Sequence, residues 1–316
     1  MTKNLAIGVD IGGSHISCAA IDLTKKQYKA ETFVQTDLDN HASANEILNI
    51  WTKTISETIQ KSNTTQIAGI GFAMPGPFDY ANGIAWFDEG VKKYESLYGL
   101  NIAETLRTQM NLPDNFPVRF INDATAFAIG EDWIGKSSGT SRSLAITLGT
   151  GFGSAFLRNH LPVTRGDEVP TLGYMYHLPF DGGNADDYFS TRGLLQRFEK
   201  RTGQRLSGVK ELASLAETSN IAAGLFTDFG YKLGTFLNPW LKKFDAEVLV
   251  IGGNISNAFN LFGANLMSCF ENEKVRVRIE ISELKESASM IGSAVLANNN
   301  YYNAIRTSIE HISQTV

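Results

Sequence analysis

The sequence predicts an α/β protein built from two related domains, and three observations lead to this fold class. The chain has 316 residues, about twice the length of a common single domain. Short apolar runs alternate with segments of helical periodicity along most of the chain. A pair of apolar runs joined by glycines occurs twice, at an offset of 139 residues, as in Ala6 and Ala145. Such a repeat predicts two similar domains with a ligand-binding cleft between them.

The first half of the chain contains the elements of one domain. Apolar or alternating runs at 5–10 and 15–23 flank Gly12 and Gly13, a pattern typical of a β-hairpin. A third strand is expected at 28–36, and a helix at 44–61, where apolar residues recur at helical spacing. The remaining elements alternate in type: strand 67–73, helix 102–110, strand 117–121 and helix 124–133.

The second half begins with the same pattern. Two apolar runs at 143–148 and 152–157 are joined by Gly149, Thr150 and Gly151. A long helical region is expected at 191–243. The later elements are strand 248–251, helix 258–270, strand 275–282, helix 287–296 and a last helix near 301–312.

Charge and composition exclude several classes of protein. The 28 basic and 33 acidic side chains give a net charge of −5 without any run rich in Lys and Arg, so no nucleic-acid partner is expected. No uncharged apolar stretch of about 18 residues and no signal-peptide core are found, which predicts a soluble cytoplasmic protein without membrane contact. Cys18 and Cys269 lie in apolar stretches, which favours buried, reduced thiols over a disulfide framework.

Two glycine-rich hairpins carry the first candidate chemistry. The backbone N–H groups of Gly12, Gly13 and Ser14 can cradle a phosphate, because glycine has no Cβ to obstruct it. Asp10, at the end of the preceding strand, can hold hydrated Mg²⁺, which prefers one or two carboxylates together with phosphate oxygens. The alternative is an ordinary glycine turn beside a solvated aspartate.

The second hairpin, at Gly149, Thr150 and Gly151, strengthens this interpretation. Two glycine-rich hairpins at equivalent places in a repeat can clamp a polyphosphate from both sides. A third glycine turn, at Gly252 and Gly253 after a buried strand, suits the base and ribose of a nucleotide, although many α/β proteins have such a strand-to-helix turn.

Two further motifs follow strands. Asp123, preceded by Asn122 where a strand meets a helix, can act as a general base on a hydroxyl that attacks phosphorus. It is equally suited to be a helix N-cap. The rigid turn that contains Pro75 and Gly76 can form a wall of a substrate pocket.

Two pattern matches are rejected. Residues 130–137 fit the P-loop pattern, but they follow a helix and include two carboxylates, whereas a functional P-loop leaves a strand and opens a helix. Residues 181–187 lack the spacing and the last glutamate of an EF-hand, so a solvated loop is expected there.

With these motifs in order, the sequence resembles the ROK family of sugar kinases, within the actin, Hsp70 and hexokinase superfamily. The matching segments span nearly the whole chain: DIGGSH at 10–15, MPGPFD at 74–79, NDATAFAIGE at 122–131, LGTGFGSA at 148–155, VIGGNIS at 250–256 and SASMIGSA at 287–294. The resemblance implies the actin-like ATPase fold, which is ribonuclease H-like, with an interdomain cleft. It also implies a small domain of 1–121 with a returning helix at about 298–316, and a large domain of 122–297.

The resemblance implies roles for individual residues. Asp10 would lie near Mg²⁺ through water, Asn122 would contact the sugar, and Asp123 would be the catalytic base. The residues implied for the phosphates of ATP are Gly12, Gly13, Ser14, Gly149, Thr150 and Gly151, and those for adenosine are Gly252 and Gly253.

The sugar side departs from the family's pattern. Where relatives carry Glu-x-Gly-His, this chain has Thr171 and Tyr174 at the functional positions, and a short loop at 182–186 replaces the cysteine-rich zinc loop. Thr171 and Tyr174 can donate hydrogen bonds to sugar hydroxyls, with Pro75 and Gly76 beside them, so an altered sugar preference and no structural zinc are expected. Two other groups nearby have no assigned role: Glu168 with His177, and the unmatched segment 86–97 with Asp88, Glu89, Lys92 and Lys93.

These features together predict a glucokinase-like enzyme that transfers phosphate from ATP, with Mg²⁺, to a hexose hydroxyl, the 6-hydroxyl by analogy. Two alternatives stay open: a polyphosphate-dependent glucokinase, since such relatives also lack the zinc loop, and a non-catalytic sugar or nucleotide sensor. The ROK repressors carry an amino-terminal helix-turn-helix, whereas a strand is expected here from about Leu5, which argues against DNA regulation. Dimers are common in the family, and a homodimer is expected.

Overall fold

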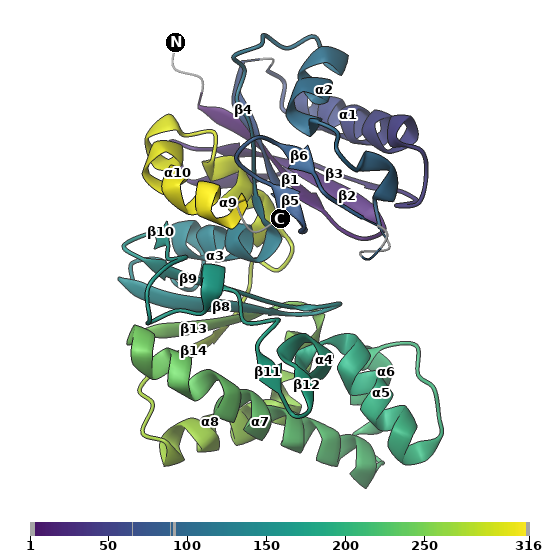
Figure 1. Ribbon diagram of the computed structural model, residues 1–316, viewed down its shortest axis with the longest axis vertical. Helices are drawn as coiled ribbons and strands as arrows, with labels where there is room; N and C mark the ends of the chain where they lie inside the picture. Colours follow the sequence, from purple (N-terminus) through teal and green to yellow (C-terminus); the bar gives the residue numbers. More distant parts are fainter. Residues whose placement is uncertain (1–3, 65, 89, 91–92, 314–316) are drawn as a thin grey trace. The chain divides into compact units, whose positions relative to one another are not determined.

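The protein is described by a computed structural model that covers residues 4–64, 66–88, 90 and 93–313 (Figure 1). Its described residues form two compact units. The first unit is drawn from Met1–Gly135, His160–Pro162 and Glu286–Val316, and the second from Lys136–Asn159 and Val163–Lys285. Each unit is an α/β structure built on one of two five-stranded sheets.

The sheet of the first unit has the strand order β3-β2-β1-β4-β7. Strands β1 (Leu5–Ile11), β2 (His15–Asp22) and β3 (Gln27–Asp37) are antiparallel neighbours. Strands β4 (Ile67–Met74) and β7 (Val118–Asn122) continue the sheet parallel to β1. The expected hairpin, third strand and alternating strands are therefore confirmed.

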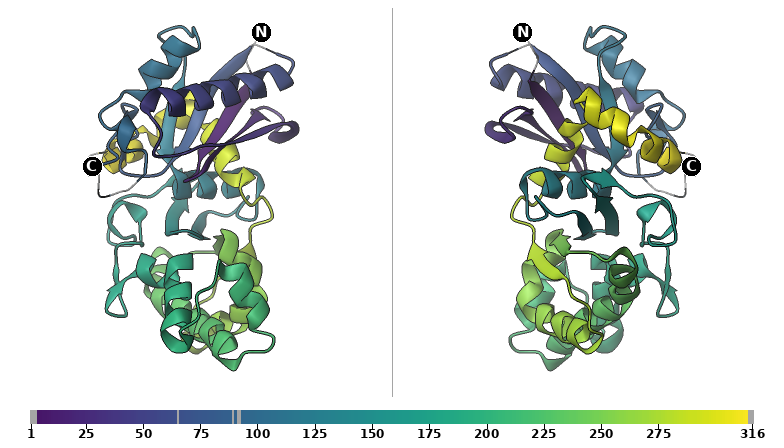
Figure 2. Two further views of the ribbon diagram at one scale, coloured as in Figure 1. Left: turned by 90° about the vertical axis from the view of Figure 1, so that its right-hand side faces the viewer. Right: turned by 90° about the vertical axis from the view of Figure 1, so that its left-hand side faces the viewer.

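Helices cover both faces of this sheet. Helix α1 (Ala44–Lys61) packs on β2 and β3, and its Ser43 and Glu46 form the capping box expected at a helix start. Helix α9 (Ser287–Val295) packs on β1 and β4, on the opposite face (Figure 2). A Cβ at Gly71 would lie 1.8 Å from the carbonyl oxygen of Ser293. Glycine is therefore required there for α9 to approach the sheet so closely.

The remaining elements of the first unit lie around this sheet. Helix α3 (Asp123–Ile134) packs against α9. The others are α2 (Ile102–Gln109), α10 (Asn299–Ser313) and the short strands β5 (Phe78–Asp79) and β6 (Ile84–Ala85).

The second unit repeats the topology of the first. Its sheet has the order β10-β9-β8-β13-β14. The strands drawn from this unit are β8 (Arg142–Leu148), β9 (Phe152–Arg158), β13 (Val248–Gly252) and β14 (Arg278–Ile281), whereas the short edge strand β10 (Leu161–Pro162) falls in the stretch His160–Pro162 that is counted with the first unit. Strands β8 and β9 are antiparallel, whereas β13 is parallel to both β8 and β14. The repeat expected from the two glycine hairpins is thus confirmed as a shared topology.

Helices and many phenylalanines form the core of the second unit. Helix α7 (Asn220–Phe244) packs against α8 (Phe259–Asn272). The rings of Phe152, Phe189 and Phe236 contact one another, with centroids 5.3–5.8 Å apart. The other elements are α4 (Ala185–Phe189), α5 (Thr191–Thr202), α6 (Val209–Leu215), β11 (Pro179–Phe180) and β12 (Gly183–Asn184). The expected helical region at 191–243 is therefore three helices: Gly203 and Gly208 lie between α5 and α6, and Ser219 caps the start of α7 after a second break.

Two details of the sequence-based organisation differ from the structure. Strands β1 and β8 correspond end to end at an offset of 137, as in Leu5 and Arg142, and not 139. Helices α3 and α9 belong to the first unit, whereas the expected boundaries at 121 and 298 placed both in the second domain. The physical reason is that α3 packs on α9, and α9 packs on β1 and β4.

The cysteines and the helices can be compared with what the composition predicts. Cys18 and Cys269 are buried and free, as expected. Across the described ranges, no helix combines the length and apolar character needed to cross a membrane.

Candidate functional site in the two units

Three parallel strands of the first unit bring its predicted site residues together. Asp10 near the end of β1 pairs in register with Ala73 of β4, and Met74 of β4 pairs with Asn122 of β7. The carboxyl ends of these strands therefore meet at one edge of the sheet, which is where α/β proteins commonly bind ligands. Asp10, the turn with Pro75 and Gly76, and the Asn122–Asp123 pair all lie at this edge.

Asn122 is the N-cap of α3. Its Oδ1 accepts hydrogen bonds from the N–H groups of Ala124 and Thr125 at 3.1 and 3.2 Å. Its Nδ2 donates to Oδ1 of Asp123 at 2.9 Å. Asp123, for which a capping role was an open alternative, is therefore the first residue of the helix, and its carboxylate is oriented by the residue that caps it.

The carboxylates at this edge have raised pKa values. Desolvation, followed by the charges of Asp123 and Glu286, raises the pKa of Asp10 to about 8. Desolvation also raises the pKa of Asp123, although its side chain keeps contact with solvent and the Ala124 N–H, Lys93 and Asn122 act in the opposite direction. A nearby cation would favour the charged form of both groups.

The first hairpin, Gly12–Ser14 with its flanking residues, is held through its carbonyl groups. The hydroxyl of Tyr94 donates to the carbonyl of Gly12 at 2.6 Å, and Nδ2 of Asn40 donates to the carbonyl of Gly13. The carbonyl of Ser14 accepts from the N–H of Leu38 at 2.9 Å. Within the described ranges, the N–H groups of Gly13 and Ser14 donate to no other residue, and both residues are exposed. Such N–H groups are available to an anion.

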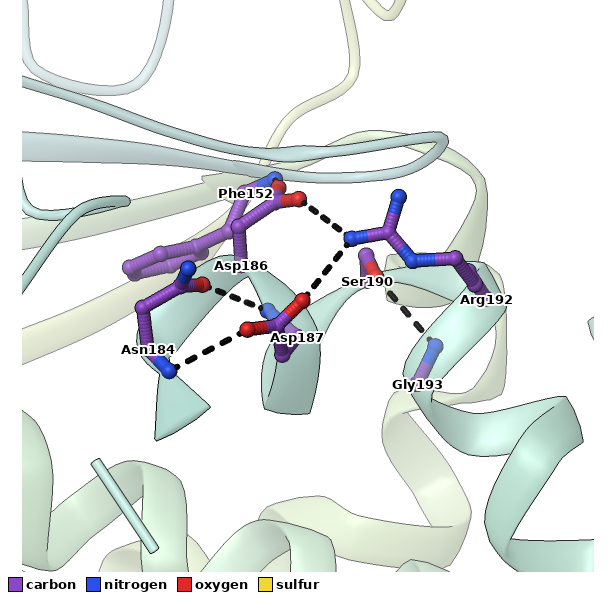
Figure 3. A network of polar contacts seen from close by, with 7 residues as sticks. All are labelled: Phe152, Asn184, Asp186, Asp187, Ser190, Arg192 and Gly193. Atoms are coloured by element: carbon purple, nitrogen blue, oxygen red, sulfur yellow. Dashed lines mark hydrogen bonds and ion pairs between the residues drawn. The ribbon is translucent and has the colours of Figure 1, made fainter. Parts of the chain in front are cut away.

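The second hairpin, Gly149–Gly151, is held differently. The carbonyl of Gly149 accepts from the N–H of Thr191, at the start of α5, at 2.8 Å. The N–H of Phe152, the next residue after the hairpin, donates to Oδ1 of Asp186 at 2.7 Å. Arg192 in turn contacts Asp186 at 3.0 Å, as Figure 3 shows. A carboxylate and a guanidinium thus lie beside this hairpin.

The third glycine turn lies against the second hairpin. Gly252, the last residue of β13, pairs in register with Thr147 of β8. Gly253 follows with φ of 80°, and a Cβ there would lie 2.4 Å from the carbonyl oxygen of Leu148. Only glycine allows this approach, so the two predicted nucleotide elements of the second unit are brought together.

The predicted sugar-side residues lie on an irregular segment of the second unit. Thr171 is exposed and begins a short 3-10 helix, Thr171–Gly173, and half-buried Tyr174 follows it. The hydroxyl of Ser154 on β9 donates to the carbonyl of Gly173 at 3.0 Å and accepts from the N–H of Met175 at 2.9 Å. This segment is therefore attached to the same β8–β9 hairpin that ends in Gly149–Gly151.

The nearby Glu168 and His177 have other surroundings. Glu168 forms an ion pair with Arg158, so its carboxylate is already engaged. His177 is exposed, and its ring lies 5.2 Å from that of Tyr176. Neither arrangement assigns these residues a sugar-binding role.

Sequence reasoning missed four side chains that hold the hairpins. The expected solvated loop at 181–187 is wrong for Asp186, which accepts a hydrogen bond from Phe152, and for Asp187, which caps α4 with Asn184. Asn40, Tyr94 and Arg192 were likewise not identified as parts of the site. Tyr94 lies in the unmatched segment 86–97, of which Glu89 and Lys92 are outside the described residues.

The rejected P-loop match lies on a helix. Residues 130–134 are the end of α3, which agrees with the rejection of a P-loop there.

No group of three or more His, Cys, Asp or Glu side chains arranged to hold a metal ion occurs in the described part of the chain. A single carboxylate, that of Asp10, is enough for hydrated Mg²⁺, because such an ion takes most of its ligands from water and phosphate.

Sequence comparison matches this chain to a protein family and to curated proteins. The sequence model of the ROK family matches residues 6–300. The N-acetyl-D-glucosamine kinase of Salmonella heidelberg (strain SL476) is 25% identical over 315 residues, covering 92% of this chain and 98% of that kinase. The "Putative xylose repressor" of Caldicellulosiruptor sp. (strain Rt8B.4) is 24% identical over 285 residues, covering 77% of this chain and 66% of the repressor.

Solved structures share the fold. The ROK hexokinase from Thermus thermophilus has a TM-score of 0.77 at 19% identity, covering 95% of this chain and 99% of that one. A ROK family glucokinase from Streptomyces griseus, in complex with glucose and AMPPNP, has a TM-score of 0.73 at 19% identity, covering 92% of this chain and 98% of that one. The expected actin-like α/β fold is confirmed by these likenesses.

Proposed function

The chain belongs to the ROK family, and we propose that it is a glucokinase-like enzyme that transfers the γ-phosphoryl group of ATP to a hydroxyl group of a hexose. The observation that carries this proposal is the carboxylate of Asp123. It lies at the carboxyl edge of the first sheet and is oriented by Asn122, and β1 at the same edge leads into the Gly12–Ser14 hairpin, in which the N–H groups of Gly13 and Ser14 are available to phosphate. The names of the kinase relatives support a sugar as the acceptor.

Asp123 is the general base in this proposal. Its carboxylate accepts the proton of the sugar hydroxyl as the hydroxyl oxygen forms its bond to the γ-phosphorus, and the bond from that phosphorus to the bridging oxygen of ADP breaks. Asn122 donates to the same carboxylate and limits its orientations. We assign the 6-hydroxyl as the acceptor by analogy with the family.

The phosphates are bound by two hairpins in this proposal. Gly13 and Ser14 would donate backbone N–H groups from the first unit, and Thr150 and Gly151 from the second. Gly12 and Gly149, predicted as further donors, use their N–H groups within the hairpins, on the carbonyls of His15 and Gly151 at 3.0 Å, so they would line the phosphates without donating to them. Gly252 and Gly253, beside the second hairpin, would contact adenosine. Asp10 would hold Mg²⁺ through water. When bound, the ion offsets the charge that develops on the phosphates.

The sugar would contact residues that relatives do not share. Thr171 and Tyr174 would donate hydrogen bonds to its hydroxyls, Asn122 would contact it near Asp123, and Pro75 with Gly76 would form part of the pocket wall. Sites that pair with hydroxyl groups discriminate strongly among sugars. We therefore expect a sugar preference that differs from that of relatives with the Glu-x-Gly-His element.

A coupled assay tests this function. The purified protein is assayed with Mg²⁺, with ATP or polyphosphate as donor, against glucose, mannose, fructose and N-acetylated hexoses. We expect turnover with ATP and a fall in kcat of about 10²–10⁴-fold in Asp123→Asn, the usual contribution of a general base. Asp114→Asn, an exposed aspartate outside the site, is the control. Turnover of no sugar, or an Asp123→Asn rate within about tenfold of the parent, contradicts the proposal.

A second candidate is a non-catalytic sugar sensor. It is favoured by the repressor among the relatives and by Thr171 and Tyr174 in place of the family's Glu and His. Calorimetry that shows sugar binding in a protein without turnover would support it. Preference for polyphosphate over ATP in the coupled assay would instead support the polyphosphate-dependent kinase.

Three further properties are proposed with the kinase. We expect a cytoplasmic homodimer, which sedimentation equilibrium would detect. We expect no structural zinc, because the loop at 182–186 contains no cysteine. Stoichiometric, tightly bound zinc in metal analysis would contradict this expectation.

A further inference from the structure

A pair of opposite charges lies directly beside the second hairpin. Asp186, in α4, accepts a hydrogen bond from the N–H of Phe152 at 2.7 Å, and Arg192, in the first turn of α5, contacts Asp186 at 3.0 Å and Asp187 at 3.1 Å (Figure 3). We propose that Arg192 neutralises the carboxylate of Asp186, and that this neutralisation determines how tightly the Gly149–Gly151 hairpin binds a polyphosphate. This inference rests on the proposed function of the hairpin.

Asp186 is required to hold the hairpin in shape. Its Oδ1 accepts from the first N–H of β9, where the hairpin ends. A Cβ at Gly151 would lie 3.0 Å from the same oxygen, so the carboxylate also contacts the tip of the hairpin. The contact orients the turn whose remaining N–H groups are to receive the phosphate.

The same carboxylate opposes anion binding. A negative charge next to a phosphate site repels the ligand, and a partly desolvated location increases the repulsion. Asp187 adds a second negative charge within reach of Arg192. Without a cation, the hairpin would combine a suitable shape with an unfavourable potential.

The position of Arg192 has no explanation in helix stability. It is the second residue of α5, where the positive end of the helix dipole disfavours a cation. Its side chain remains 53% exposed, so burial does not require it either. Its contacts with Asp186 and Asp187 do explain the position, because one guanidinium can bridge two carboxylates.

The test separates neutralisation from direct phosphate binding. Arg192→Gln, Asp186→Asn and the double variant are compared with the parent protein by calorimetry with ADP and with tripolyphosphate, at low and high salt. Asparagine keeps an oxygen that can accept from the Phe152 N–H, so the hairpin retains its hydrogen bond. Arg205→Gln, which removes another exposed ion pair, Arg205 with Glu199, is the matched control.

We expect Arg192→Gln to weaken the binding of both ligands by about tenfold at low salt, and high salt to reduce the difference, because exposed charges are screened. The double variant should bind within about threefold of the parent, since the carboxylate that needed compensation is gone. Circular dichroism and thermal melting establish that each variant is folded.

Two outcomes for the variants overturn the inference. A double variant that stays as weak as Arg192→Gln means that Arg192 contacts the phosphate itself. An Arg192→Gln variant that binds like the parent and like Arg205→Gln means that the pair has no effect on affinity. A parent protein that binds ADP and tripolyphosphate but phosphorylates no sugar contradicts the proposed kinase and leaves this inference standing, whereas a parent that binds neither contradicts both.

Discussion

The two glycine hairpins occupy the same place in two sheets of the same topology, yet different side chains hold them. The first is held by uncharged donors: Tyr94 and Asn40 donate to its carbonyl groups. The second also has a carbonyl, that of Gly149, held by an N–H group, that of Thr191, but it has in addition a charged acceptor, Asp186, which receives the N–H of Phe152 and is itself paired with Arg192. A shared topology therefore does not imply a shared way of fixing the turn.

The difference has a consequence for ligand binding. Donors on the carbonyl groups of the first hairpin leave the N–H groups of Gly13 and Ser14 to an anion and add no charge beside them. The acceptor on the second hairpin uses one N–H group and adds a negative charge, which then needs compensation. We therefore expect salt and charge-altering substitutions to affect the second hairpin, and pH to act mainly through the carboxylates beside the first.

The largest expected effect concerns acidification. Because the pKa values of Asp10 and Asp123 are raised, Asp123 is ionised and active as a base above its raised pKa. As the pH falls it becomes protonated and inactive earlier than an ordinary aspartate, whose pKa is about 4. We expect kcat/KM to fall by about tenfold per pH unit below that raised pKa. Asp114→Asn should show the same acid limb. A kcat/KM that stays constant down to pH 4 would show that no such group acts in the free enzyme.

A pair of glycine substitutions compares the two hairpins directly. A Cβ at Gly151 would lie 3.0 Å from Oδ1 of Asp186, which is held by Phe152 and Arg192. A Cβ at Gly12 would lie 3.3 Å from the ring of His15, whose own contact with the Ser14 hydroxyl is long, at 3.4 Å, and 3.4 Å from the His15 carbonyl oxygen. Since overpacking against a fixed group costs about 1–3 kcal/mol, Gly151→Ala should weaken ADP binding by about tenfold or more.

Gly12→Ala is the matched control for that substitution. It should weaken ADP binding by less than about threefold, because the His15 side chain can shift. Calorimetry measures both variants under one set of conditions. Equal losses in the two would mean that the way each hairpin is held does not affect its tolerance of a side chain.

The smallest expected effect concerns the first hairpin. Tyr94→Phe removes one buried hydrogen bond to the carbonyl of Gly12, which should lower the free energy of unfolding by about 0.5–1.5 kcal/mol. Burial raises the pKa of Tyr94, so its hydroxyl stays protonated and the loss should be the same at low and high salt. Urea unfolding measures it, with Tyr98→Phe, an exposed tyrosine, as the control. A loss that changes strongly with salt would contradict the uncharged character of this contact.

The sequence alone determined the sheets, the glycine hairpins and the strand-to-helix junction at Asn122. Each of these is encoded locally, by alternation of apolar residues, by glycines between two strands or by a capping residue before a helix. The same local signal explains the error in the repeat offset. A shift of two residues leaves every side chain on the same face of a strand, so the pattern fits equally well at 137 and 139.

Only the tertiary structure decided what holds the two hairpins. Tyr94 is 82 residues from Gly12 in the sequence, and Asp186 is 34 residues from Phe152. No periodicity or spacing connects residues so far apart, because their contacts arise when loops fold against strand ends. It was likewise packing of α3 on α9, and not any boundary in the sequence, that placed these helices in the first unit. Local patterns thus predicted which turns could bind phosphate, and long-range contacts decided how each turn is held.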